Sequence, residues 1–168
     1  MTAKDHQIQI VKEYFKPALK GKGYKTTGQM WWKEEEQFYI LINWQNSQWN
    51  SKDNVSFCFN IGIALKEKIE PKGRNPKYAD IIGVLREAVF LPEERRNHIY
   101  RKGSGLGYLI TNETNTNDFI RELNKDLENH IYPALDRLKT IDDCIAFYRQ
   151  FDFLYVTNPY LDKYKQAH

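Results

Sequence analysis

Three stretches between Tyr24 and Leu65 alternate apolar and polar residues with a period of two. Such alternation predicts strands of an antiparallel sheet with one buried face. The positions that fall on the apolar face are Tyr24, Met30, Trp32, Phe38, Ile40, Ile42, Trp44, Val55, Phe57, Phe59, Ile61, Ile63 and Leu65. The opposite, polar-aromatic face carries Thr27, Gln29, Trp31, Tyr39, Leu41, Asn43, Ser56, Cys58 and Asn60. This mixture of rings and amides is where we expect a function.

The parity of the first two strands predicts how they pair. A three-residue loop over residues 34–36 sets Trp32 opposite Phe38. It also sets Trp31 opposite Tyr39, so that each face keeps one character. The connection from Gln45 to Asn54 is rich in amides and contains Trp49, which is typical of a surface loop.

Helical spacing precedes and follows these strands. A first helix is predicted from about Ala3 to Lys20, with a capping box at Thr2 and Asp5 and a kink at Pro17. The apolar spacing from Tyr78 to Leu85, after Asn75-Pro76, predicts a second helix. A third helix begins at Asn115 or Thr116 and contains Pro133. A short fourth helix starts at the capping box of Thr140 and Asp143.

Two further strands are expected, between Glu87 and Leu91 and between Leu106 and Thr111. The predicted fold is therefore α+β, with a mainly antiparallel four- to five-stranded sheet and the N-terminal and C-terminal helices packed on one face. A length of 168 residues predicts a single domain over residues 1–168.

Composition narrows the class of protein. Hydrophobic residues make up 41% of the chain and aromatic residues 14%, which excludes a disordered protein. The formal net charge of +3 does not suggest a dedicated nucleic-acid binder. Residues 1–9 lack the apolar core of a secretory signal, and no run of 18 apolar residues suggests a membrane span. We therefore expect a cytoplasmic protein without a membrane partner.

Cysteines and histidines do not point to catalysis. Cys58 and Cys144 are the only cysteines and are expected to be reduced, packed thiols. The four histidines are scattered, without a second histidine at ligand spacing. The sequence therefore predicts no metal site, no cofactor and no catalytic residue.

Cations gather in a segment that we call the basic loop, and its members are Arg95, Arg96, His98, Arg101 and Lys102. Such a loop could hold phosphates, RNA or an acidic protein surface. The alternative is a solvated loop, because Glu93 and Glu94 cancel part of the charge. The glycines from Gly103 to Gly107 precede a strand instead of a helix, which favours a flexible turn over a phosphate loop.

The polar-aromatic face offers a different binding surface. Trp31 and Tyr39 would stack a planar ligand, and amides such as Asn43 and Asn60 would supply hydrogen bonds around it. Aromatic residues also anchor protein interfaces. The alternative is that residues 78–91 cover this face, in which case the amides need buried partners.

Four segments resemble a bacterial family, the domain of unknown function numbered 4304. They are YFKPALKGKGYK at residues 14–25, INWQNSQW at 42–49, FCFNIGI at 57–63 and IYPAL at 131–135. The resemblance implies a small cytoplasmic α+β protein with no established activity. It singles out Asn43, Gln45, Trp49 and Asn60 as motif positions.

Three functional hypotheses follow from these patterns. The first is a binding or interaction module for a protein or small-molecule partner, with a site formed by Trp31, Tyr39, Asn43, Gln45, Trp49 and Asn60. The second is nucleic-acid (RNA) binding through the basic loop. The third, which is weaker, is an enzyme that uses His98 and the neighbouring arginines on a phosphorylated substrate. The oligomeric state is not predicted.

Overall fold

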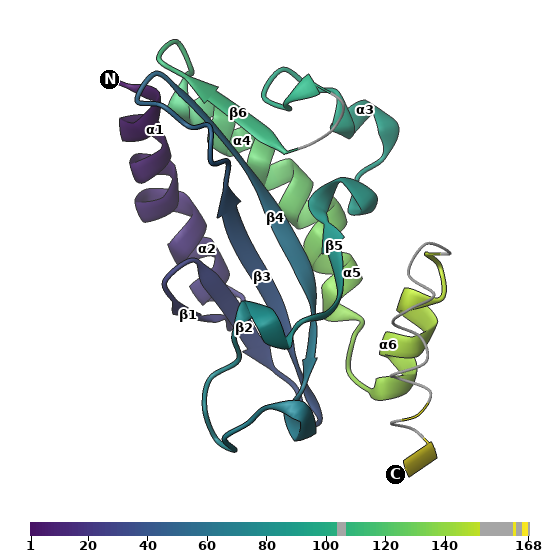
Figure 1. Cartoon of the computed structure of the whole chain (residues 1–168). Coiled ribbons are helices and arrows are strands. Elements are labelled where there is room, and N and C mark those ends of the chain that lie inside the picture. The colour runs from purple at the N-terminus through teal and green to yellow at the C-terminus, as the bar shows by residue number, and fades with distance from the viewer. Residues whose placement is uncertain (104–106, 152–162, 164–165, 168) are drawn as a thin grey trace.

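A computed structural model of the chain describes residues 1–103, 107–151, 163, 166 and 167 (Figure 1). Six strands form one antiparallel sheet in the order β1-β2-β3-β4-β5, and β6 pairs with β4. The strands are β1 Lys25–Thr27, β2 Met30–Glu34, β3 Phe38–Asn46, β4 Asn54–Leu65, β5 Ile82–Arg86 and β6 Tyr108–Thr111. The expected α+β class with a mainly antiparallel sheet is confirmed.

Strand β4 organises the sheet because three strands pair with it. One edge pairs with β3 from Phe57 to Leu65. The other edge is shared, since β5 pairs with Asn60–Ile63 and β6 with Asn54–Phe57. Eleven of its twelve residues are buried. This confirms the long alternating stretch as a strand whose two faces are both largely covered.

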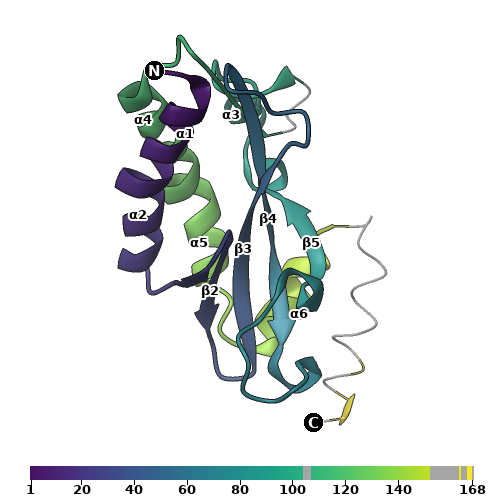
Figure 2. The same ribbon diagram turned by 60° about the vertical axis from the view of Figure 1, so that its left-hand side comes forward.

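Two long helical rods lie side by side on one face of the sheet (Figure 2). The first consists of α1 Ala3–Gln9, a π-helical segment Ile10–Phe15 and α2 Lys16–Gly21. The second consists of α4 Thr116–Asp126, a π-helical segment Leu127–Ile131 and α5 Tyr132–Asp136. Two further, short α-helices are α3 Glu93–Arg96 and α6 Ile141–Tyr148. None of the described helices is long and apolar enough to cross a membrane.

Three of the four helix starts predicted from local sequence are confirmed. Thr2 and Asp5 form a capping box, and so do Thr140 and Asp143. The side chain of Asn115 accepts a hydrogen bond from the amide of Asp118 and caps α4. These signals were readable because a cap involves only residues three apart in the chain.

Each rod widens into a π-helical turn directly before a proline. The amide of Lys16 donates to the carbonyl of Val11, five residues back, and Pro17 follows. The amide of Tyr132 donates to Leu127 in the same way, and Pro133 follows. Proline lacks the amide that an α-helix requires and crowds the carbonyl four residues back. The wider turn tolerates both the missing amide and the crowded carbonyl, so the rod continues past the proline.

The rods bury the main core against the sheet. Its members from β3 and β4 include, as predicted, Phe38, Ile40, Ile42, Trp44, Val55, Phe57, Phe59, Ile61, Ile63 and Leu65. Rings dominate its centre, where Phe15 of the first rod stacks on Phe59 with centroids 5.0 Å apart. The predicted faces of β3 and β4 are therefore confirmed.

The predicted pairing of β2 with β3 is wrong by three residues. Trp31 lies opposite Ile42 and Trp32 lies opposite Leu41. The hairpin closes tightly, with the amide of Glu35 donating to the carbonyl of Phe38 over 2.9 Å. A shift by an odd number of residues exchanges the two faces of a strand.

Trp31 therefore belongs to the main core, and Met30 and Trp32 lie on the opposite face. There they form a second cluster with Leu41, Ala64 and Ile69.

The segment after β4 also differs from the prediction. The expected helix is only a 3-10 turn, Tyr78–Asp80, and the expected strand Glu87–Leu91 is a 3-10 turn over Glu87–Phe90. Strand β5 lies between them because the open edge of β4 pairs with it. Gly62 permits this close approach, since a Cβ there would overlap the side chain of Ile81.

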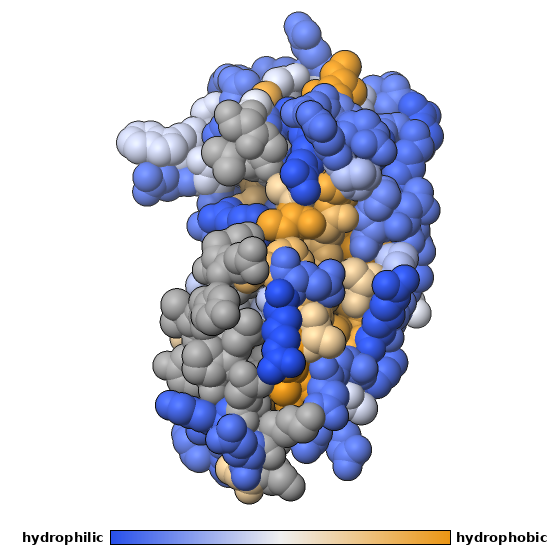
Figure 3. All heavy atoms as spheres, turned by 90° about the vertical axis from the view of Figure 1, so that its right-hand side faces the viewer, coloured by the Kyte–Doolittle hydropathy of each residue, from blue (hydrophilic) through white to orange (hydrophobic). Residues whose placement is uncertain are grey.

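The side of the molecule that carries β5 and α6 shows apolar side chains between charged ones (Figure 3). Half-buried apolar residues in this region include Ile82, Val89, Phe90 and Phe147, which pack against the main core. The hydroxyl of Tyr148 donates to the carbonyl of Ile82 over 3.1 Å and ties α6 to β5.

Candidate functional site

Three of the six residues predicted for the polar-aromatic surface meet in one hydrogen-bonded group, which we call the amide network. The amide nitrogen of Asn60 donates to Oδ1 of Asn43 over 3.1 Å and to Oε1 of Gln45 over 2.6 Å. The amide of Asn43 in turn donates to the carbonyl of Gln29 over 3.3 Å. Asn60 is 1% exposed, while Gln45 is exposed. The network thus connects the buried centre of the polar face to its surface.

The three aromatic or loop residues of that prediction lie elsewhere. Trp31 is on the other face of the sheet, edge-on to Phe15 with centroids 4.9 Å apart. Tyr39 packs with the second cluster, under the ammonium of Lys66. Trp49 is 83% exposed in the turn between β3 and β4. The expected pair of Trp31 and Tyr39 is therefore not formed, because the register of the hairpin separates them.

Part of the polar face is covered, as the alternative interpretation expected. Ile69 and Ile81, both from the connection between β4 and β5, pack on its apolar half. The half that carries the amide network instead meets Arg86 at the end of β5. The cover therefore comes from the connection before β5 and from the last residue of β5.

The basic loop contains a buried ion pair. Arg101 donates to a carboxylate oxygen of Glu87 over 2.9 Å, and both side chains are 1% exposed. The other oxygen of Glu87 accepts the amide of Phe59. Burial raises the pKa of Glu87, although Arg101 and the Phe59 amide favour its charged form. The guanidinium of Arg101 also lies over the ring of Tyr108.

A second carboxylate holds Arg95 and His98 of the loop. Asp126 is fully buried and accepts hydrogen bonds from Arg95 at 2.7 Å, His98 at 3.1 Å and Tyr108 at 2.7 Å. Burial acts to raise the pKa of Asp126, but these three hydrogen bonds outweigh it and lower the pKa. Arg95 also pairs with Glu122 over 2.7 Å. The sequence did not show a carboxylate beside His98, because Asp126 is distant in the chain.

The two remaining members of the basic loop differ from each other. Arg96 donates to the backbone carbonyls of Ala88 and Leu91 over 2.8 and 2.7 Å, while Lys102 is exposed. Four of the five basic-loop residues thus have internal partners. Of the glycine-rich turn that follows, residues 104–106 lie outside the described part of the chain.

A different cationic feature lies between the first rod and the β1–β2 hairpin. Two cavities there, of about 380 and 770 Å³, share Lys12, Lys16 and Trp31 in their walls. Lys20 and Lys25 line the larger cavity, and Trp44 lines the smaller one. We call the two together the lysine groove.

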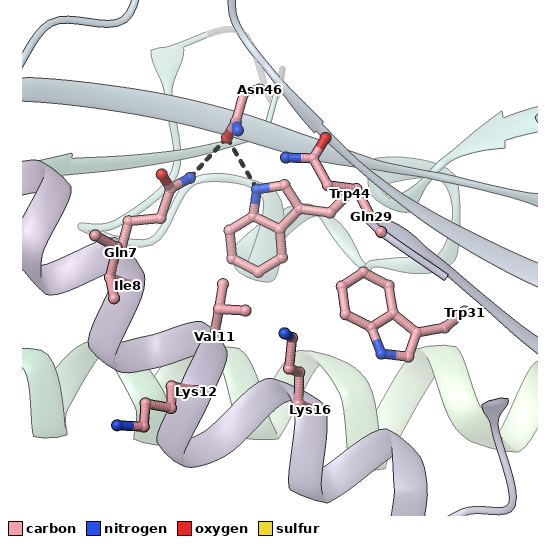
Figure 4. Close-up of a pocket in the computed structure, with 10 residues that line it drawn as sticks. Gln7, Ile8, Val11, Lys12, Lys16, Gln29, Trp31, Trp44 and Asn46 are labelled. Carbon is pink, nitrogen blue, oxygen red and sulfur yellow. Dashed lines mark hydrogen bonds between the residues drawn. The ribbon is translucent and has the colours of Figure 1, made fainter. Parts of the chain in front are cut away.

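The walls of the lysine groove are rigid rings (Figure 4). Oδ1 of Asn46 accepts hydrogen bonds from the indole of Trp44 over 3.0 Å and from Gln7 over 2.6 Å. Trp44 also stacks on Phe57 with centroids 3.8 Å apart. Trp31 is 2% exposed, and within the described part of the chain its indole N–H has no acceptor. A buried donor without a protein partner is rare, and an ordered water or a ligand would supply its acceptor.

Within the described part of the chain, the cations of the groove are unpaired. Among the described residues, none of Lys12, Lys16, Lys20 and Lys25 forms an ion pair with a carboxylate. No acidic side chain lines either cavity. Figure 4 shows Lys16 directed between the two indoles and Lys12 directed away from them. A cleft with one sign of charge and apolar walls attracts ligands of the opposite sign.

The sequence analysis did not identify the lysine groove as a site. Its one visible signal is the spacing of Lys12, Lys16 and Lys20, which places them along one side of a helix. The other half of the groove depends on Trp31, which the predicted register assigned to the wrong face. Among the described residues, no group of three or more His, Cys, Asp or Glu side chains converges on a potential metal site.

Comparison with known proteins gives a family without an assigned activity. No curated protein and no solved structure matches the chain. A family model described as "Domain of unknown function (DUF4304)" matches residues 15–137. That match runs from the end of the first π-helical segment through all six strands to the end of the second rod. The chain therefore belongs to the DUF4304 family.

Proposed function

We propose that the protein is a binding module that holds an acidic segment of a partner protein in the lysine groove. Among the described residues, four lysines have no carboxylate partner and the buried indole N–H of Trp31 has no acceptor, and this combination supports the proposal most strongly. An acidic ligand would satisfy both, because carboxylates neutralise the lysines and also accept hydrogen bonds.

The shape of the groove favours an extended ligand. Lys12, Lys16 and Lys20 span roughly 10–12 Å of the first rod. In an extended peptide, side chains on the same side recur about every 6.6–6.8 Å, so that acidic residues at alternate positions can meet successive lysines. Strand β1 lies at the edge of the sheet, and among the described strands it pairs only with β2. Its free edge offers backbone groups to an added strand.

Apolar contacts complement the charges. Ile8 is 56% exposed and Val11 is half-buried, and both line the smaller cavity. They suit apolar residues placed between the acidic residues of the ligand. Such contacts add binding energy that salt does not screen.

The rings of the groove disfavour single-stranded RNA. Proteins that bind single-stranded RNA without sequence preference use exposed aromatic side chains, on whose faces the bases stack. Trp44 is already stacked on Phe57, and Phe15 lies edge-on to both indoles. The basic loop offers little to RNA either, since carboxylates hold Arg95 and Arg101.

The first experiment measures peptide binding by fluorescence anisotropy at low and physiological salt. The probe is a labelled ten-residue peptide in which glutamate alternates with valine and serine. The comparison peptide has the same composition with its glutamates in one block. We expect the alternating peptide to bind at least threefold more tightly, because only it matches the spacing of the lysines.

Two triple variants test the site. Changing Lys12, Lys16 and Lys20 to Gln should weaken binding at least tenfold. The matched control changes Lys68, Lys72 and Lys77, which are exposed on the connection between β4 and β5, to Gln. Equal losses in the two variants, or no binding at low salt, would contradict the proposal. Tighter binding of a single-stranded RNA that the first variant abolishes would replace the proposed partner with nucleic acid.

A spectroscopic readout identifies the role of Trp31. On addition of the alternating peptide, the indole N–H resonance of Trp31 should shift, and that of the exposed Trp49 should not. Shifts confined to Trp49 would place the ligand outside the groove.

A further inference from the structure

Another pocket lies where the polar face of β3 and β4 meets the end of β5 and Lys102, the residue after the buried Arg101. Its volume is about 190 Å³, and the side chains used below are those of Gln45, Ser47, Cys58, Arg86 and Lys102. We propose that this polar-face pocket binds a phosphoryl group. It contains none of the four lysines of the lysine groove, so the two proposals stand or fall separately.

The amide network orients a donor toward the pocket. Oε1 of Gln45 accepts the amide of Asn60 over 2.6 Å, which leaves the NH₂ group of Gln45 as the part available to a ligand. The hydroxyl oxygen of Ser47 accepts the amide of Trp49 over 3.2 Å. The proton of that hydroxyl is therefore available for donation. Two neutral donors thus border the pocket.

Two cations join these donors from distant parts of the chain. Arg86 ends β5, and Lys102 follows the basic-loop residue Arg101. Within the described part of the chain, neither forms an ion pair with a carboxylate, and no acidic side chain lines the pocket. Glu87, the buried acid next to Arg86 in the chain, is already held by Arg101 and by the amide of Phe59.

Cys58 lies beside one of these cations. Nη1 of Arg86 contacts the sulfur of Cys58, and both side chains line the pocket. Burial raises the pKa of the Cys58 thiol, and the charge of Glu87 acts in the same direction. The thiol therefore stays neutral at physiological pH and does not neutralise Arg86. The positive charge remains available for a ligand.

The number and kind of donors favour a phosphoryl group over a carboxylate. A carboxylate carries one negative charge and two oxygens, whereas a phosphate monoester carries about −1.5 to −2 charges and three acceptor oxygens at neutral pH. Two cations and two neutral donors match a phosphate monoester better than a carboxylate. The volume suits one phosphate group. The phosphoryl group can belong to the free ion or to a monoester.

The test uses the full chain and ¹H–¹⁵N spectra at constant ionic strength. Inorganic phosphate, glycerol 3-phosphate and acetate are titrated separately, with the side-chain NH₂ of Gln45 and the amides of Ser56 and Cys58 as reporters. We expect saturable shifts with both phosphates and at least tenfold weaker binding of acetate. The ratio of the two phosphate affinities then distinguishes a free ion from an esterified ligand.

Two variants and one control decide the assignment. Arg86→Gln and Lys102→Gln should each weaken phosphate binding at least fivefold, while Lys16→Gln in the lysine groove should leave it unchanged. Both altered side chains are exposed, so their removal should preserve the rest of the spectrum. Absence of saturation, equal binding of acetate, or unchanged affinity in both variants would overturn the proposal.

Discussion

The basic loop and the lysine groove are both rich in cations, but the fold uses them differently. In the basic loop, Arg101 is buried against Glu87, and Arg95 and His98 converge on Asp126. In the groove, the lysines are exposed and meet no carboxylate among the described residues. The denser cluster in the sequence is therefore the one with less charge available to a ligand.

The difference shows that a run of cations acquires its role from partners outside the run. The carboxylates of Glu87, Glu122 and Asp126 come from a turn and from α4, and they convert the loop into an internal connection between β5 and the second rod. Burying a charge is costly unless it is paired and hydrogen-bonded. Exposed lysines have no such requirement and stay available for an external partner.

The sharpest test of this comparison is Glu87→Gln. It should lower the free energy of unfolding by about 3–5 kcal/mol, because Arg101 would lose its carboxylate in a buried position. Denaturant titration followed by circular dichroism measures the change. Glu113→Gln, at an exposed position, is the matched control and should change stability by less than about 0.5 kcal/mol. A loss below about 1 kcal/mol in Glu87→Gln would show that the ion pair does not support the loop.

The next largest effect is expected for Asp126→Asn. The carboxylate accepts from Arg95, His98 and Tyr108, and an amide cannot accept from all three with equal strength. We expect a loss of about 2–3 kcal/mol, since hydrogen bonds to charged groups contribute more than neutral ones. The resonances of His98 should shift together with those of Tyr108. Independent behaviour of the two rings would mean that Asp126 does not join them.

A smaller effect concerns pH and Glu122. Hydrogen bonds from Lys125 and Arg95 lower its pKa to about 2. A carboxylate with a lowered pKa contributes stability that is complete above its unfolded value, near 4.3, and is lost as the pH falls toward about 2. In Glu122→Gln, the free energy of unfolding should fall less over this pH range, by on the order of 1 kcal/mol. The effect is no larger because the Glu122 carboxylate is partly exposed and solvent screens its charge.

The comparison must be made between Glu122→Gln and the unaltered chain. Other carboxyl groups titrate in the same range. Glu87, whose pKa is raised, acts above this range and in the opposite direction, because it lowers the free energy of unfolding as the pH rises above its unfolded value. If the free energy of unfolding falls equally with pH in the two proteins, Arg95 and Lys125 do not stabilise the charged form of Glu122.

The smallest effect is expected in the groove. The triple change of Lys12, Lys16 and Lys20 to Gln should alter the free energy of unfolding by less than about 0.5 kcal/mol, because exposed charges without partners contribute little to stability. Thermal unfolding at low salt measures this change in the free energy of unfolding. A loss above about 1 kcal/mol would mean that these lysines support the fold and are not reserved for a ligand.

Much of the sheet could be predicted because its signals are local. The period of two in β3 and β4 placed Asn43 and Asn60 on the same face, and the two side chains do meet. The register of β2 could not be predicted in this way, since it depends on how tightly the chain turns before Phe38. That single error moved Trp31 from one candidate site to the other.

The region between residues 66 and 105 resisted prediction for a related reason. The spacing from Tyr78 to Leu85 is helical, but the free edge of β4 offers backbone hydrogen bonds to β5. Tertiary pairing therefore overrode local spacing. The same part of the chain supplies Arg86, Glu87 and the basic loop, so no local pattern could assign their charges to partners.

By itself the sequence determined the features that depend on neighbours in the chain: the α+β class, the faces of β3 and β4, and the helix caps. The tertiary structure alone decided the face of Trp31, the pairing of the basic loop with Glu87 and Asp126, and the closure of the lysine groove. The physical reason is the distance along the chain over which each effect acts. Periodicity and capping act over a few residues, whereas burial of a charge or a ring depends on side chains that only the complete fold brings together.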